Sequence, residues 1–265
     1  LLEGADWNDT LDMARNRGES SCFQSFYAGN LSILIALLES LKVQGIQSMA
    51  LLEEISILLD QTGDQKAVDY DTIFEKREKI NAYFQLVRSR ISGNRRNFEI
   101  AKLITDLKVK EEHSKQQIRS KEWIETDDEG GYFNGHYDDL GRAMHGKFTE
   151  GYRMDLTSQV MPLMFDVADD DQVKKLYSAA KRFLGDLEKP GLKLCTPYPD
   201  IDMNIGRITG FVYGFKEHGS KWMQQNIMFM HGLFHRNQVD AGYEMFHDIF
   251  KLSNDSGVSK TFPGI

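Results

Sequence analysis

Two short runs near the start of the chain combine residue types that can act on sugars. Asp6-Trp7-Asn8-Asp9 brings together two carboxylates, an amide and an indole, and Arg17-Gly18-Glu19-Ser20 follows shortly after. An indole covers the apolar face of a sugar ring, while carboxylates and amides bond to its hydroxyls. A carboxyl group desolvated against Trp7 would have a raised pKa and could protonate a glycosidic oxygen. Asp and Asn ahead of a helix are also common N-caps, and on this pattern alone the cap is the better-supported interpretation.

The composition of the 265-residue chain limits its partners. A net charge of -8 with 41% hydrophobic residues indicates a soluble globular protein, and the acidic balance argues against a nucleic-acid surface. Cys22 and Cys195 are the only cysteines, which excludes a disulfide framework and favours a reducing cytoplasm. We recognise neither a signal peptide nor an apolar run that could cross a bilayer, so no membrane partner is expected.

Apolar residues three and four positions apart predict a series of amphipathic helices. The predicted helices cover Ser20 to Val43, Gln47 to Leu59, Asp71 to about Ser92, a following charged stretch to about Arg119, a helix capped by Asp169-Asp170-Asp171 and stopped by Lys189-Pro190-Gly191, Met223 to His235, and Val239 to Leu252. Between them, Glu125 to Gly151 and Leu192 to Ser220 lack a sustained period and are predicted to be loops. This order predicts an all-α fold, a helical toroid whose loops gather at one end.

Further runs, in a fixed order, extend the two runs at the start of the chain. They are Gly131-Tyr132-Phe133-Asn134-Gly135-His136-Tyr137-Asp138, Leu156-Thr157-Ser158-Gln159-Val160, Gly206-Arg207-Ile208-Thr209-Gly210-Phe211, Tyr213-Gly214-Phe215-Lys216-Glu217-His218-Gly219 and Phe262-Pro263-Gly264-Ile265. With Asp6 to Asp9 and Arg17 to Ser20, this series resembles the catalytic region of cellobiose phosphorylase and its relatives. The family includes phosphorylases of β-1,3- and β-1,2-glucooligosaccharides.

The resemblance implies an (α/α)6 barrel with a β-sandwich domain before it and a small β domain after it. Residues 1–265 are then expected to be the later part of the catalytic barrel of a longer multidomain protein, truncated at both ends. Members of the family are commonly dimers, so a homodimer is a further expectation.

The reaction that the resemblance implies is inverting phosphorolysis. Inorganic phosphate, a co-substrate rather than a cofactor, attacks the anomeric carbon of a β-glucoside and releases α-glucose 1-phosphate. Such a reaction needs one enzyme acid, because phosphate is itself the nucleophile. By position the resemblance makes Asp9 this general acid, with Trp7, Asn8 and Asp6 binding substrate. Arg17 takes a phosphate-binding position, although an ordinary charged residue near a helix start fits equally well.

The same resemblance assigns three later residues to substrate binding. Tyr132 and Asn134 belong to the glycine-tyrosine loop, and Glu217 matches a sugar-contacting glutamate. A solvated surface glutamate is the competing interpretation of Glu217.

One position departs from the family pattern. Relatives have Glu-Asn-Gly and then, five residues beyond the glycine, a histidine that helps to bind phosphate. Here Glu217-His218-Gly219 is followed at that place by Gln224. Glutamine donates a hydrogen bond but carries no charge. Gln224 takes over the phosphate-binding role, His218 or Lys221 compensates, or phosphate is not the acceptor.

Two alternatives to phosphorolysis remain at this stage. An inverting glycoside hydrolase of the same fold would use Asp139, Asp155 or Glu217 to activate water. A non-catalytic carbohydrate-binding or scaffold protein would have kept the barrel and lost turnover. We predict no metal site, since His231 and His235 on one helix lack a third ligand at a suitable spacing.

Overall fold

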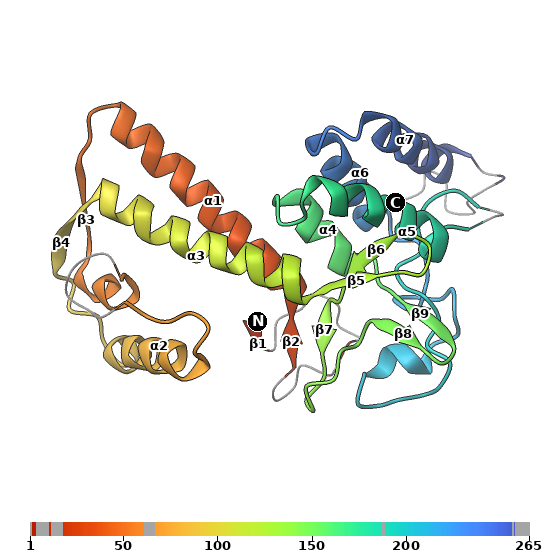
Figure 1. The fold of residues 1–265 in the computed structure, drawn as a ribbon, viewed down its shortest axis with the longest axis horizontal. Coiled ribbons are helices and arrows are strands. Elements are labelled where there is room, and N and C mark those ends of the chain that lie inside the picture. The colour runs from red at the N-terminus through yellow and green to blue at the C-terminus, as the bar shows by residue number, and fades with distance from the viewer. Residues whose placement is uncertain are drawn as a thin grey trace. The chain divides into compact units, whose positions relative to one another are not determined.

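The computed structural model describes residues 2–3, 11, 18–60, 67–186, 189–255 and 257. Helices dominate, and short strands form four small antiparallel sheets within these residues (Figure 1). The all-α prediction is therefore confirmed for the helices and missed the strands. The chain divides into two compact units: unit 1 comprises Leu1–Tyr27 and Lys115–Ile265, and unit 2 comprises Ala28–Ser114.

Helix α1, Ser21–Val43, confirms the first predicted helix and contributes residues to both units. Its buried residues Ala28, Leu31, Ile35 and Leu38 recur at steps of three and four, as one face of a helix requires. By length and composition alone α1 could cross a membrane, contrary to the expectation from the sequence. A core helix passes the same test, and 44% of its most apolar window is buried inside the protein.

Unit 2 is built around two antiparallel strands that lie far apart in the sequence. Strand β3, Ser48–Leu52, runs antiparallel to β4, Arg95–Glu99, which leads directly into helix α3, Ile100–Lys121. The core of this unit gathers apolar side chains from these elements and α1, namely Ile35, Leu38, Leu59, Phe98, Ile100, Leu103 and Ile104.

The predicted helix from Gln47 to Leu59 is wrong. Strand β3 is followed there by a short 3-10 helix, η1, Glu53–Leu58. Met49 pairs with Phe98 across the ladder, so a partner nearly fifty residues away decides the conformation of this segment. Dense apolar runs of this length suit a buried strand as well as a helix, and periodicity does not separate the two.

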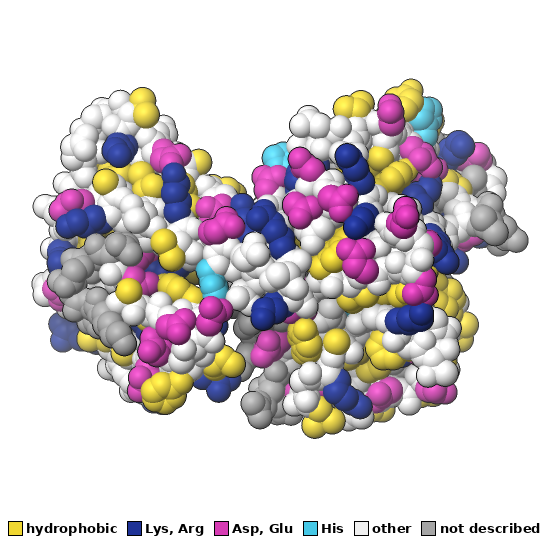
Figure 2. Space-filling model, in the orientation of Figure 1, with side chains coloured by type: hydrophobic (Ala, Val, Ile, Leu, Met, Phe, Trp, Pro, Cys, Tyr) yellow, Lys and Arg dark blue, Asp and Glu magenta, His cyan; other side chains and the backbone are white. Residues whose placement is uncertain are grey.

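Helix α2, Ile73–Val87, is shorter than predicted and buries none of its residues. Its apolar residues Ile73, Phe74, Ile80 and Phe84 are exposed. Hydrophobic side chains are scattered over the face of the molecule drawn in Figure 2. On the face drawn there, Lys and Arg alternate with Asp and Glu. That face therefore carries no basic field of the kind that nucleic acids require.

Short strands organise unit 1 in the region predicted to be a loop between Glu125 and Gly151. The strands of this unit are β1 Leu2–Glu3, β2 Glu19–Ser20, β5 Trp123–Glu125, β6 Gly131–Phe133, β7 His136–Tyr137, β8 Gly146–Phe148 and β9 Gly151–Arg153. Each is two or three residues long, too short to show a period. Strand β6 pairs with β5, β9 pairs with β8, and β7 joins the N-terminal strands β1 and β2. The sheet β1-β2-β7 pairs Leu2 with Ser20 and Ser20 with His136.

Three of the remaining helices of unit 1 agree well with the sequence. They are α5 Asp170–Leu184, α6 Met223–His235 and α7 Val239–Asn254, with a 3-10 turn η2, Arg207–Gly210, in the predicted irregular stretch. Helix α4, Thr157–Met164, was not among the predicted helices. Asp169 caps α5 through a reciprocal capping box with Gln172, which confirms the predicted start. The helix ends at Leu184, before the predicted stop.

Helices α4 and α6 pack closely because Gly232 on α6 has no side chain. A Cβ at Gly232 would lie 2.6 Å from Cγ of Leu163 on α4. Leu163 and Leu233 are both fully buried. This contact fixes α4, whose first turn follows Asp155, against the C-terminal helix pair.

A buried glutamate just after α3 forms hydrogen bonds that connect the end of this helix to strand β7 of the N-terminal sheet and to the residues before it. The Glu122 Oε2 atom accepts hydrogen bonds from Asn134 Nδ2 at 3.0 Å and from Tyr137 Oη at 2.9 Å. The backbone N–H of Asn134 also donates to the Glu122 carbonyl oxygen at 2.7 Å. Burial raises the pKa of Glu122, and the two bonds to its carboxylate only partly offset this effect.

A native pKa above the unfolded value favours folding at low pH, and this contribution is lost as pH rises through the native pKa. We therefore expect Glu122→Gln, which keeps an acceptor oxygen without a charge, to gain stability relative to wild type as pH rises above about 4.3. The difference should grow by no more than about 1.4 kcal/mol per pH unit, the limit for one proton. Urea unfolding of both proteins across pH 4 to 8 measures it. The exposed Glu129→Gln is the matched control, and a pH-independent difference for Glu122→Gln contradicts the assignment.

Candidate active site

The residues predicted to carry the acid and one phosphate contact lie outside the described residues. These are Asp6, Trp7, Asn8, Asp9 and Arg17, so their roles stay predictions. The structure does describe Leu11, two residues after Asp9, and Gly18, directly after Arg17, and both contact the rest of unit 1.

Leu11 and Gly18 both contact the loop that contains His136. Leu11 is buried in a cluster with Met144 and Tyr198, and the Met144 backbone N–H donates to the carbonyl oxygen of His136 at 2.9 Å. At the other end, the Gly18 N–H donates to Asp139 Oδ1 at 3.1 Å. Leu11 and Gly18 thus both contact residues within a few positions of His136.

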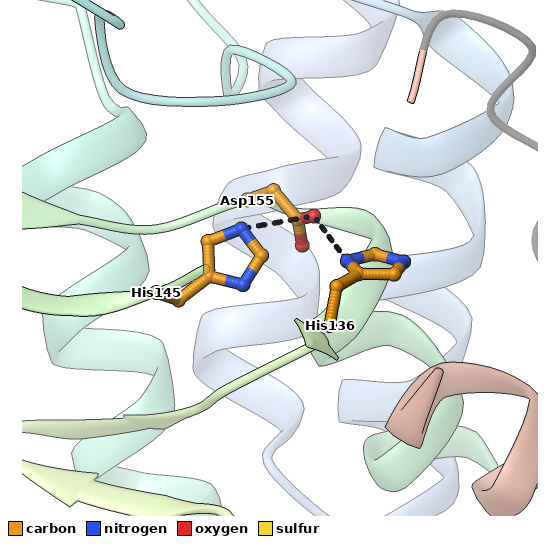
Figure 3. A group of neighbouring side chains, drawn as sticks. All are labelled: His136, His145 and Asp155. Atoms are coloured by element: carbon orange, nitrogen blue, oxygen red, sulfur yellow. Dashed lines mark ion pairs between the residues drawn. The ribbon is translucent and has the colours of Figure 1, made fainter. Parts of the chain in front are cut away.

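His136, His145 and Asp155 meet in the interior of unit 1 (Figure 3). Asp155 Oδ2 lies 3.6 Å from His136 Nδ1 and 3.3 Å from His145 Nε2. All three residues are buried, with 2%, 3% and 5% of their surface exposed. The other carboxylate oxygen, Asp155 Oδ1, accepts the Ser158 backbone N–H at 2.7 Å.

The ligand atoms of these three side chains lie within 4.8 Å of one another, a spacing that a metal ion can bridge. A metal-bound histidine, however, donates its second ring N–H to an acceptor. His145 Nδ1 instead accepts the Gly135 backbone N–H at 3.0 Å. Its proton therefore lies on Nε2 and points toward Asp155, which leaves no lone pair there for a metal. The donor set does not fit a metal centre in the arrangement described.

The polar residues around this cluster hold it in place from α4. Gln159 donates to the Phe133 carbonyl oxygen at 3.0 Å and accepts the Phe133 N–H at 2.8 Å, which ties β6 to α4. A Cβ on Gly135 would lie 1.5 Å from Ser158 Oγ, so only glycine allows this approach of the β7 loop to α4. The run Leu156 to Val160 thus supports the cluster.

Tyr132 and Asn134, predicted to bind substrate, are both buried in the described part of the chain. Tyr132 is fully buried, and its hydroxyl donates toward the carbonyl oxygens of Gly146 and Arg153. Asn134 is 3% exposed, bonds to Glu122 and accepts the His145 N–H at 3.2 Å. Neither side chain is open to a sugar there, because backbone and carboxylate partners already use its polar atoms.

Glu217 lies in the turn between Phe215 and His218 and is partly buried. Its Oε2 atom is shielded from solvent and has no hydrogen-bond partner among the described residues. The Glu217 carbonyl oxygen, in contrast, accepts Cys195 Sγ, next to the bridge between Asp155 and Cys195. A shielded carboxylate oxygen without a partner is available to a ligand hydroxyl.

Gln224 is exposed in the first turn of α6, and the two residues that might compensate for it are engaged elsewhere. His218 Nε2 accepts the Tyr198 N–H at 3.0 Å, and its Nδ1 lies 2.6 Å from the Phe211 carbonyl oxygen. Lys221 Nζ donates to the carbonyl oxygens of Lys189 and Pro190. Burial lowers the pKa of Lys221, although nearby Asp186 opposes this effect. Neither side chain is available to replace a phosphate-binding histidine.

His231 and His235 lie at the surface of α6. Their rings stack with centroids 6.4 Å apart, and His235 Nε2 lies 3.1 Å from Asp166 Oδ2. His235 and Asp166 thus form a polar contact at the protein surface.

Sequence reasoning missed three residues that the structure brings together beside the N-terminal segment. Glu122 carried no motif, and His136 and His145 lie in a stretch without a period. The only available signal was the position of His136 within the glycine-tyrosine run. Their convergence depends on pairing between β2 and β7, which joins residues more than a hundred positions apart.

A family model described as the catalytic domain of the glycosyl hydrolase 94 superfamily matches residues 92–258. This range contains Tyr132, Asn134, Glu217 and Gln224 and begins after Arg17. A search of curated proteins found no match. The match covers more than half of the chain and confirms the resemblance at the level of the superfamily, which includes enzymes of the cellobiose phosphorylase type. The chain therefore belongs to the glycosyl hydrolase 94 superfamily, and the matched region is its catalytic domain.

Proposed function

We propose that the protein is an inverting glycoside phosphorylase that cleaves β-linked glucooligosaccharides with inorganic phosphate and releases α-glucose 1-phosphate. The observation that carries this proposal is the match to the glycosyl hydrolase 94 catalytic domain. The contacts of Leu11 and Gly18 with the matched region support it, since these residues are close in sequence to Asp9 and Arg17.

In the proposed reaction Asp9 protonates the glycosidic oxygen while phosphate attacks the anomeric carbon from the opposite face. Phosphate is already an anionic nucleophile, so no carboxylate is needed to remove a proton from it. Trp7 covers a sugar face, and Asn8 and Asp6 bond to its hydroxyls. Arg17 holds two phosphate oxygens with its planar fork. Glu217 Oε2 accepts a sugar hydroxyl.

The proposal places residues 1–265 in the later part of an (α/α)6 barrel within a longer, cytoplasmic protein that forms homodimers. The α4, α6 and α7 packing of unit 1 supplies helices of the kind such a barrel stacks. Tyr132 and Asn134 serve as positioning residues behind the sugar site, through their bonds to β8, β9 and Glu122.

A hydrolase of the same superfamily is the second candidate, favoured by the uncharged Gln224 and the unpartnered Oε2 of Glu217. Hydrolysis with inversion needs a second carboxylate that activates water. Glu217 suits that role better than Asp155, which is buried and bonded to Ser158, or Asp139, which accepts the Gly18 N–H.

The synthetic direction separates the two candidates. The full-length protein, incubated with α-glucose 1-phosphate and glucose, cellobiose, laminaribiose or sophorose, is expected to release inorganic phosphate and lengthen the acceptor. Phosphate release is followed by a colorimetric assay, and the products by chromatography. Degradation of β-glucooligosaccharides at an unchanged rate after phosphate is removed supports the hydrolase instead. No release across the acceptor panel contradicts phosphorolysis.

Asp9→Asn is expected to lower kcat for phosphorolysis about 10²- to 10⁴-fold, because the amide cannot give a proton to the leaving oxygen. Phosphate affinity, measured by calorimetry without sugar, should change little, since the acid faces the leaving group. Asp171→Asn, an exposed position on α5, is the matched control. Retention of wild-type kcat by Asp9→Asn would mean that another residue is the acid.

A further inference from the structure

The backbone of Glu217 makes the contacts that hold this residue in the described part of the chain. Its carbonyl oxygen accepts the Gly219 N–H at 2.9 Å and Cys195 Sγ at 3.6 Å. Its side-chain Oε2 atom is shielded from solvent and has no hydrogen-bond partner among the described residues. The place of this carboxylate therefore depends on what holds the turn that carries it.

The turn has a backbone conformation that other contacts must maintain. Lys216 has a φ of 50° and Gly219 a φ of 80°, both in the left-handed region. Within the turn, the Gly214 N–H donates to the His218 carbonyl oxygen at 2.7 Å, and the His218 N–H donates to the Phe215 carbonyl oxygen at 3.2 Å. Residues other than glycine rarely adopt a positive φ, and they keep it where surrounding contacts enforce it.

The ring of His218 joins this turn to a separate segment of the chain. Its Nε2 atom accepts the Tyr198 N–H at 3.0 Å, so the ring proton lies on Nδ1, 2.6 Å from the Phe211 carbonyl oxygen. The buried ring also packs against Tyr198 and Tyr213, with centroids 5.6 Å and 5.3 Å apart. Both ring nitrogens thus connect backbone groups.

The segment that His218 reaches is held in the interior of unit 1. The Thr196 N–H donates to the Met154 carbonyl oxygen at 2.9 Å, and the Met154 N–H donates to Thr196 Oγ1 at 3.0 Å. A second link comes from Tyr213, whose hydroxyl donates to the Cys195 carbonyl oxygen at 3.0 Å. The turn is therefore connected to a fixed part of the catalytic domain by two side chains of its own loop.

Resting on the proposed phosphorolysis, we propose that His218 is a positioning residue for Glu217. By joining Phe211 to Tyr198, it holds the turn so that Glu217 Oε2 meets a hydroxyl of the glucooligosaccharide. It acts on sugar binding and does not contact phosphate, since both ring nitrogens already have partners. The family pattern has asparagine at this place, and an amide also offers a donor and an acceptor on one planar group.

The test compares substitutions in the full-length protein. His218→Phe keeps a ring beside the two tyrosines and removes both hydrogen bonds, whereas His218→Asn keeps a donor and an acceptor. His231→Phe, on the surface of α6, is the matched control. We expect His218→Phe to raise KM for cellobiose, laminaribiose or sophorose at least about tenfold, since a hydrogen bond to a charged group is weakened. KM for phosphate should not change, and His218→Asn should lie closer to wild type.

A double-mutant cycle with Glu217→Ala shows whether His218 acts through Glu217. Calorimetry with the same sugar in the absence of phosphate measures affinity, so the cycle does not require turnover. His218→Phe should weaken sugar binding in wild type and change it little in the Glu217→Ala background. Equal losses in both backgrounds contradict the positioning role. His218→Gln, which places its donor and acceptor at a different reach, replaces His218→Phe in the cycle if that variant does not fold.

The outcomes separate this inference from the proposed function. A wild-type protein that cleaves none of these sugars with phosphate overturns both. An active wild type, with unchanged sugar KM in His218→Phe, overturns only the role of His218. An equal rise in KM for phosphate overturns that role too, because the positioning of Glu217 affects the sugar alone.

Discussion

The pairing of β2 with β7 is the constraint on which the described site depends. Two residues of each strand, Glu19 with Tyr137 and Ser20 with His136, join the N-terminal segment to the matched catalytic region. The Ser21 backbone N–H continues this contact by donating to the Gly135 carbonyl oxygen at 2.9 Å. Strands this short have little stability of their own. They persist because buried polar groups on the β7 side fix the loop that presents them.

Two buried carboxylates near β7 show two ways of placing an acid in the interior. Glu122 accepts hydrogen bonds from the neutral donors Asn134 and Tyr137, and burial raises its pKa. Asp155 lies beside two imidazoles and accepts a backbone N–H. The difference lies in the partner types rather than in the depth of burial.

The sequence predicts helices α5 and α6 of unit 1 because each buries a regular stripe. Met223–His235 is confirmed at both ends, and the start of α5 follows from the capping chemistry of Asp169. The segment from Gln47 to Leu59 was mispredicted because its conformation depends on β4, far along the chain. Motif matching identified the right superfamily, but it treated Tyr132 and Asn134 as sugar contacts. A motif records which residues recur and not whether they touch ligand or support the residues that do. The residues at the centre of the resemblance, Asp9 and Arg17, lie outside the described part of the chain, so their predicted roles stay predictions.

Because Gln224 carries no charge, the basic residues near it in the sequence must be considered with it. His218 and Lys221, the nearest candidates in sequence, are both committed to backbone carbonyl oxygens or amides. A phosphate site depends on the charge and hydrogen-bond donors that surround the anion, and not on the strand or helix that supplies them.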